Sequence, residues 1–166
     1  MPAESQKLYP GELATSGEIR LLADEYRNAA YLLRPLGRAG EPLSRAPFRL
    51  SAIHAIELYL NALLLQRGYP ASVIRGMQHD LAERTQLAVA NGLGLRSRTA
   101  AHLQALAENR EYLVTRYGPE LSGTISPINR LEATLDEVSK KVTEMLAAKR
   151  SGIGARALNG VAPRQV

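Results

Sequence analysis

Hydrophobic residues recur every three or four positions along five stretches of the chain, and this spacing predicts five helices. The predicted helices cover 15–34, 44–67, 80–91, 97–117 and 126 to about 146. Glycine and proline separate them and stop each from running into the next. Because the linkers are short and the helices long, we expect an all-α, up-down bundle of about five helices.

Polar residues at the expected helix starts support these boundaries. Thr15 followed by Glu18 has the spacing of a capping box, and Ser126 before Pro127 is a typical N-terminal pair. The last predicted helix carries one apolar stripe, which we interpret as core, with a dimer seam as the alternative. The stripe comprises Ile128, Leu131, Leu135, Val138, Val142 and Met145.

The length of 166 residues fits one domain, and the absence of cysteine excludes disulfides and thiolate metal sites. We predict an N-terminal extension at 1–15, a helical domain at 16–147 and a basic disordered tail at 148–166. Four of the five net positive charges lie in 147–166, so the predicted body is nearly neutral. No secretory leader and no apolar run near the length of a membrane span are evident, so we expect a cytoplasmic protein without membrane contact.

The second predicted helix is the most apolar, yet it carries His54, Glu57 and Asn61 on one face. A carboxylate buried there without a partner would be costly. His79 and two downstream arginines are available partners, and Asp80 can cap the third helix so that His79 faces the second. The residues His54, Glu57, Asn61, His79 and Asp80 therefore predict a polar network, which is either structural or part of a ligand site.

No metal or cofactor is expected. His54 and Glu57 have the spacing of metal ligands on a helix, but the chain has three histidines and no matching second pair. P-loop, dinucleotide and nucleophile-elbow motifs are absent from the sequence.

The segment from Arg110 to Tyr117 is the best candidate for binding a nucleic acid. Arg110 and Arg116 are six residues apart, so on one helix they approach the same side. With Tyr112 and Tyr117 they could hold a phosphate and stack a base. The alternative is an exposed helix end with mixed charge, since three glutamates lie nearby in the sequence.

Three segments in this order resemble the HEPN family, small helical proteins of bacteria and archaea. They are His54–Leu64, His79-Asp80-Leu81 and Arg110–Tyr117, and the resemblance covers about Ser16 to Leu146. It departs at Asn61, where the family commonly has lysine. The resemblance implies RNA or nucleotide binding, a homodimer, and a nucleotidyltransferase or a toxin–antitoxin counterpart as protein partner.

The resemblance also departs at the catalytic motif. Family members that cleave RNA without metal have an arginine followed a few residues later by a histidine; here Arg110 is followed by Arg116. Arginine stays charged and cannot act as a general base near neutral pH. We therefore predict binding without cleavage. One alternative is a metal-independent ribonuclease using Arg49 with His54 or Arg96 with His102; the other is a structural adaptor.

Overall fold

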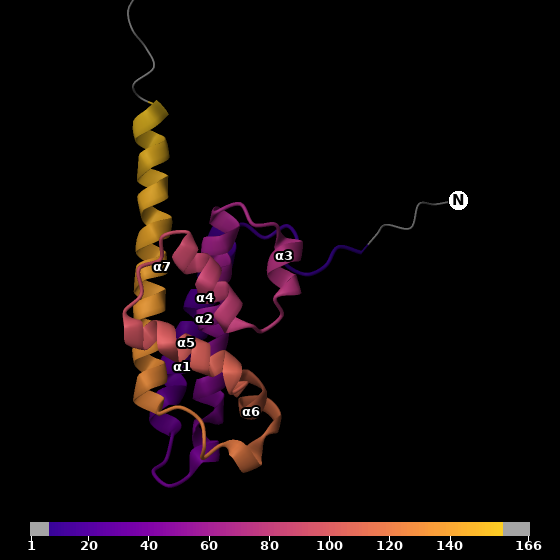
Figure 1. Ribbon diagram of the computed structural model, residues 1–166, viewed down its shortest axis with the longest axis vertical. Coiled ribbons are helices and arrows are strands. Elements are labelled where there is room, and N and C mark those ends of the chain that lie inside the picture. Colours follow the sequence, from indigo (N-terminus) through magenta and orange to yellow (C-terminus); the bar gives the residue numbers. More distant parts are fainter. Residues whose placement is uncertain (1–6, 158–166) are drawn as a thin grey trace, which may run out of the picture.

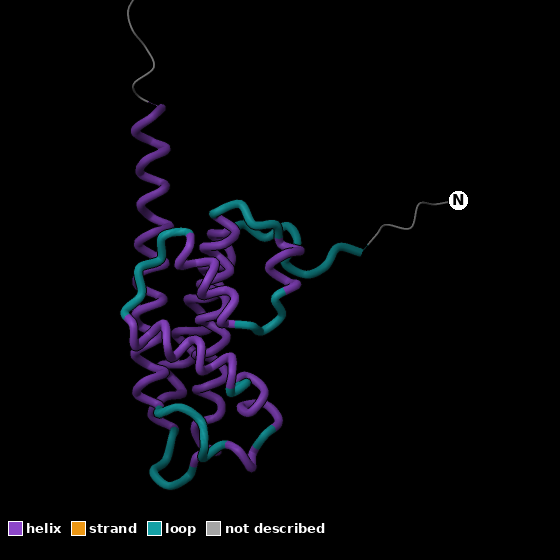
Figure 2. Tube along the Cα trace, viewed as in Figure 1, coloured by secondary structure: helices purple, strands orange, loops and turns teal. Residues whose placement is uncertain are grey.

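The computed structural model describes residues 7–157, with side chains up to residue 148, and that part of the chain is helical without a strand (Figures 1 and 2). The predicted all-α class is confirmed, with seven α-helices rather than about five. They are α1 Ser16–Leu33, α2 Ala46–Gln66, α3 Ala71–Gly76, α4 Leu81–Ala90, α5 Ser97–Glu108, α6 Glu111–Tyr117 and α7 Ile128–Ala157. Three short 3-10 turns accompany them: η1 Arg34–Leu36, η2 Pro42–Arg45 and η3 Pro119–Leu121.

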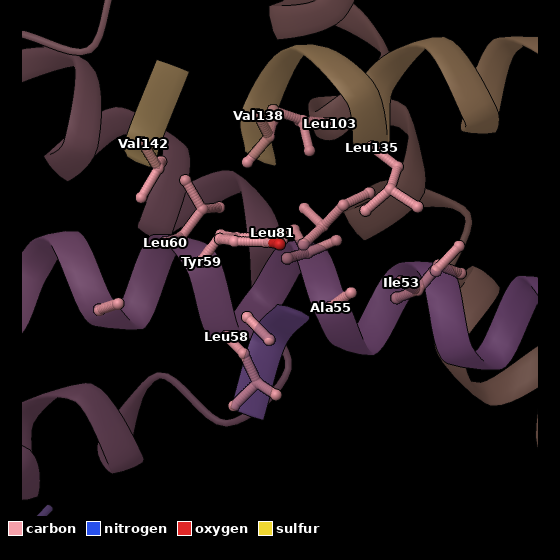
Figure 3. Packing of buried hydrophobic residues seen from close by; sticks show 14 of the residues in the cluster. Ile53, Ala55, Leu58, Tyr59, Leu60, Leu81, Leu103, Leu135, Val138 and Val142 are labelled. Atoms are coloured by element: carbon pink, nitrogen blue, oxygen red, sulfur yellow. The ribbon is translucent and has the colours of Figure 1, made fainter. Parts of the chain in front are cut away.

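Helix α2 lies at the centre of the bundle, between α1 and α7, and α5 crosses the long axis (Figure 1). The stripe of α7 packs on α2, as Figure 3 shows for Val142 beside Leu60, with Val138 and Leu135 further along α7. Leu135, Val138 and Val142 have no exposed surface. The interpretation of this stripe as intramolecular core is confirmed.

The short helix α3 was not predicted. It follows Pro70 and places Ile74 and the adjacent Met77 against Leu64 near the end of α2. Six residues are too few to establish a helical period in the sequence, so tertiary packing decides their conformation.

The single helix predicted over 97–117 was wrong, because the chain breaks between α5 and α6. Arg110 adopts a left-handed backbone with φ of +51°, which ends the helical path. The break turns Glu111 into the interior, where its Oε1 accepts a hydrogen bond from the Ser126 backbone N–H at 2.7 Å. Oε2 lies 3.5 Å from Arg49 Nη1. The buried contacts of Glu111, and not local helix propensity, therefore decide the backbone conformation at Arg110.

Two expected boundaries of the domain can be compared with the structure only in part. Thr15 caps α1 with the predicted capping box. Helix α7 continues to Ala157, beyond the expected end of the domain at 147. Residues 1–6 of the predicted extension and 158–166 of the predicted tail lie outside the described residues.

One segment, Pro42–Gln66, is long and apolar enough to cross a membrane, so the expectation that no run approaches that length was wrong. Of the most apolar 18-residue window of this segment, 72% is buried inside the molecule. Burial of this kind is typical of the core helix of a helical domain.

Candidate functional site

Glu57 lies at the centre of a polar cluster on α2. Its side chain is 11% exposed, and Oε2 accepts a hydrogen bond from His79 Nδ1 at 3.1 Å. Its other oxygen, Oε1, lies 3.7 Å from Arg84 Nη2. The structure therefore brings Glu57 and His79 together as the sequence predicts. The guanidinium that pairs with the Glu57 carboxylate, however, comes from α4 and not from α6.

Arg84 holds this cluster together and was missed by the sequence analysis. Its side chain is 2% exposed, and Nε donates to Asn61 Oδ1 at 2.7 Å. The terminal nitrogens donate to backbone carbonyls in α3 and in the turn before α4, those of Asp80 at 3.1 Å, Ile74 at 3.2 Å and Met77 at 3.4 Å. Burial lowers the pKa of Arg84, and the charge of Glu57 opposes that shift. The sequence feature that could have identified Arg84 is its charge at a position on the buried face of α4.

The turn before α4 aims His79 at Glu57. Gln78 adopts a left-handed backbone with φ of +48°, and the Asp80 N–H closes the turn on the Met77 carbonyl at 2.9 Å. Asp80 then caps α4 by accepting the Glu83 N–H at 3.0 Å, as predicted. Left-handed residues other than glycine are uncommon and often occur at binding sites.

The second left-handed residue, Arg110, precedes a residue that contacts this turn. Tyr112 of α6 packs on the His79 ring, with centroids 4.9 Å apart. Gln78 and Arg110 are the only residues other than glycine with positive φ in the described part of the chain. The two left-handed residues, Gln78 and Arg110, therefore lie next to or near the two residues whose rings pack together, His79 and Tyr112.

His54 borders the same cluster from α2. Tyr26 of α1 packs edge to face with its ring at a centroid distance of 4.4 Å. Burial lowers the pKa of His54, Glu57 opposes this shift, and the charges of Arg116 and His79 add to it. The imidazole is therefore neutral at neutral pH.

The four residues predicted to bind RNA do not form one patch. Arg110 precedes α6 and Arg116 lies in its last turn, so the expected helical register between them is lost at the left-handed Arg110. Tyr112 is half-buried against His79, whereas Tyr117 is 74% exposed. Arg116 and Tyr117 border a shallow hollow of about 190 Å³ beside η2.

The residue pairs of the ribonuclease alternative are separated. Arg49 is buried and donates from Nη2 to the Ser126 carbonyl at 2.5 Å, while His54 faces Tyr26. His102 is buried and hydrogen-bonded through Nδ1 to Thr134 Oγ1 at 2.8 Å. Its predicted partner, Arg96, is exposed at the start of α5.

A cleft of about 720 Å³ opens over the Glu57 cluster. Its floor carries His54, Glu57, Asn61, His79 and Arg84, and its walls come from α1, α3 and residues 9–11. Asp80, the remaining member of the predicted network, joins it through its backbone carbonyl. The structure thus places the predicted polar residues at the bottom of a space large enough for a small molecule.

Within the part of the chain that the structure describes, no group of three or more histidine, cysteine, aspartate or glutamate residues could hold a metal ion. Comparison of the chain with known protein families, curated proteins and solved structures found no match. The resemblance to HEPN proteins therefore rests on the three sequence segments alone.

Proposed function

We propose that this protein is a HEPN-like protein that binds RNA or a nucleotide at the exposed end of α6, around Arg116 and Tyr117, and does not cleave it. The observation that carries the proposal is the state of Arg116. Arg116 is exposed in the last turn of α6 and has no carboxylate within 4 Å among the described residues. The exposed ring of Tyr117 follows it directly.

None of the three glutamates near α6 in the sequence, Glu108, Glu111 and Glu120, lies within 4 Å of the Arg116 guanidinium. The carboxylate of Glu111 is fully buried and paired with Arg49, and Glu57 is paired with Arg84. Neither is available to Arg110 or Arg116. An exposed guanidinium can bind a phosphate through two parallel hydrogen bonds, and a tyrosine face can stack on a base.

Binding without cleavage agrees with the positions of the histidines. His102 lies inside the bundle, and Arg49 is committed to Glu111 and Ser126. His54 is exposed to the cleft without Arg49 beside it, so neither expected arginine–histidine pair lies at one reactive surface. A homodimer and a nucleotidyltransferase or toxin–antitoxin partner stay predictions from the resemblance.

The test is the affinity for a labelled single-stranded RNA, read by fluorescence anisotropy in EDTA. Arg116→Ala removes a phosphate ligand, so we expect about tenfold weaker binding and a shallower dependence on salt between about 50 and 200 mM. Arg98→Ala is the matched control, because Arg98 is also exposed but lies in the first turn of α5, away from α6. Equal losses in both variants, or no binding by the native protein, would contradict the proposal.

A further inference from the structure

The charges that line the cleft compensate one another. Glu57 Oε1 faces Arg84 Nη2 at 3.7 Å, and Arg75 Nη1 lies 2.6 Å from Glu12 Oε2. The two arginines that line the cleft, Arg75 and Arg84, are thus each held against a carboxylate and offer no free guanidinium to an anion. A phosphate inside it would lie near the Glu57 carboxylate, and like charges in a partly dry site repel strongly. The cleft is therefore suited to an uncharged group.

Its walls are apolar and its size is that of a small-molecule site. Helices α1, α2 and α3 contribute Ile19, Leu22, Leu58, Leu65 and Ile74. A volume of about 720 Å³ falls in the range of ligand pockets, roughly 300–1,000 Å³. Aliphatic walls gain from covering apolar surface of any shape, including both faces of an aromatic ring.

The floor offers hydrogen-bonding groups that the protein does not use. Asn61 Oδ1 accepts from Arg84 Nε at 2.7 Å, which fixes the amide so that Nδ2 is its remaining donor. Within the described residues, neither Asn61 Nδ2 nor the ring nitrogens of His54 make a hydrogen bond. The two side chains lie seven residues apart on one face of α2. A heteroaromatic ring with donors and acceptors on its edge matches them.

We infer that the cleft holds a single unpaired nucleobase, so that the ligand is a nucleotide or an unpaired end of RNA instead of a duplex. This inference rests on the proposed function for the identity of the ligand. His79 links the two parts, because it lines the cleft and its ring packs on Tyr112 of α6 at a centroid distance of 4.9 Å, on the helix that carries Arg116. The base enters the cleft while the phosphate stays outside at Arg116.

Two variants test the site. Leu22→Trp fills the cleft from α1, where Leu22 is 44% exposed, and Leu32→Trp on the same helix, 78% exposed, is the control outside the cleft. Asn61→Asp keeps an oxygen for Arg84 and replaces the free donor by an acceptor. Each ¹⁵N-labelled protein is titrated with adenosine, guanosine, cytidine and uridine, and NMR shifts of the α2 amides are recorded.

We expect at least one nucleoside to shift these amides in the native protein and in Leu32→Trp, with binding at least about tenfold weaker in the two cleft variants. Nucleosides carry no phosphate, so their binding should not change with salt or with Arg116→Ala. RNA binding measured on the same samples separates the two proposals. If RNA binds through Arg116 but no nucleoside causes a shift, the cleft inference fails and the proposed function stands; if neither binds, both fail. Nucleoside binding unchanged in Leu22→Trp would also overturn the cleft site.

Discussion

Arg84 is a buried cation whose charge and hydrogen-bond donors are answered by the protein itself. Its guanidinium joins Glu57 and Asn61 of α2 to three carbonyls around the start of α4. A single side chain therefore fixes the floor of the cleft and the turn that presents His79. The shape of the site therefore depends on a residue whose charge and donors are already bound within the protein.

Replacing this residue by methionine should destabilise the whole fold. Arg84→Met leaves the Glu57 carboxylate with His79 as its remaining partner and three carbonyls without their donor, and removing one member of a buried ion pair costs about 3–5 kcal/mol. Urea denaturation followed by circular dichroism measures this difference. Arg38→Met, at the exposed Arg38–Glu41 pair, is the control, with an expected loss below about 1 kcal/mol. A similar small loss in both variants would show that Arg84 is not structurally essential.

His102 predicts how stability changes with pH. Burial lowers its pKa to about 4, helped by the charges of Arg130 and Arg49. The unfolded chain takes up a proton near pH 6.5 but the folded chain does not, so unfolding binds protons and stability falls on acidification. Between pH 7 and pH 5 we expect a loss of about 2 kcal/mol from this residue.

His102→Gln isolates that contribution. Glutamine can keep a hydrogen bond to Thr134 but does not titrate, so the variant should lose less stability over the same pH range. Urea midpoints of both proteins at pH 7 and pH 5 give the comparison. Because the pKa of His54 is also lowered, part of the pH dependence remains in the variant. Identical pH dependence in the two proteins would mean that His102 is not held neutral.

Sequence reasoning at the residue scale found Glu57, His79 and the cap at Asp80, because charge in an apolar helix and capping chemistry are local signals. It could not choose among the arginines that might answer Glu57. That choice depends on the rotation of α4 about its axis, which the burial of Leu81 and Ala88 in the main core sets. For the same reason it could not show that Arg49 and His54 face different neighbours.

At the scale of elements, α5 has no capping side chain of its own. Its N-cap is Arg96, and the carboxylate of Glu137 on α7 takes the place of a cap by accepting the Arg96 N–H at 2.7 Å and the Thr99 hydroxyl at 2.5 Å. Burial alone would raise the pKa of Glu137, but hydrogen bonds from Lys141, Thr99 and Arg96 lower it to about 2. The contact joins α5 to α7 and supplies the N-terminal cap that α5 lacks.

Glu137→Gln should weaken this junction. The amide keeps one acceptor but loses the charge, and charge-assisted hydrogen bonds are worth about 1.5–3 kcal/mol, so we expect about 2 kcal/mol lower stability at pH 7. The native advantage is present above about pH 4.5 and is lost as the pH falls toward 2, where the carboxylate takes up a proton. Thermal unfolding at pH 7 and pH 3 measures both effects. Equal stability of the two proteins at pH 7 would refute this role.

Helices α5 and α6 show why an element boundary can escape a sequence pattern. Arginine at 110 is a good helix former, and asparagine at 109, the C-cap of α5, is compatible with a helix that ends and with one that continues. The break follows from the contact of Glu111 with Arg49 and Ser126, which are distant in sequence. By contrast, the N-terminus of α1 carries its own capping box and was predicted correctly.

At the scale of the whole molecule, α2 separates two polar clusters. On one side Glu57 and Arg84 lie under the open cleft; on another Arg49 and Glu111 are enclosed, near His102. The all-α class and the central place of α2 follow from its nearly continuous burial, which composition already indicated. Which cluster is open could not follow from composition, because the positions of α3 and residues 9–11 decide it.

The most direct test of the central proposal is to incubate the purified protein with a labelled single-stranded RNA in EDTA and to read band shift and fragments on parallel native and denaturing gels. We predict a shifted band that weakens with added salt, and RNA that stays intact. Fragments formed by the native protein and absent with His54→Ala or His102→Ala would contradict binding without cleavage. RNA that is neither shifted nor cut would contradict the assignment of the exposed end of α6 as a nucleotide-binding surface.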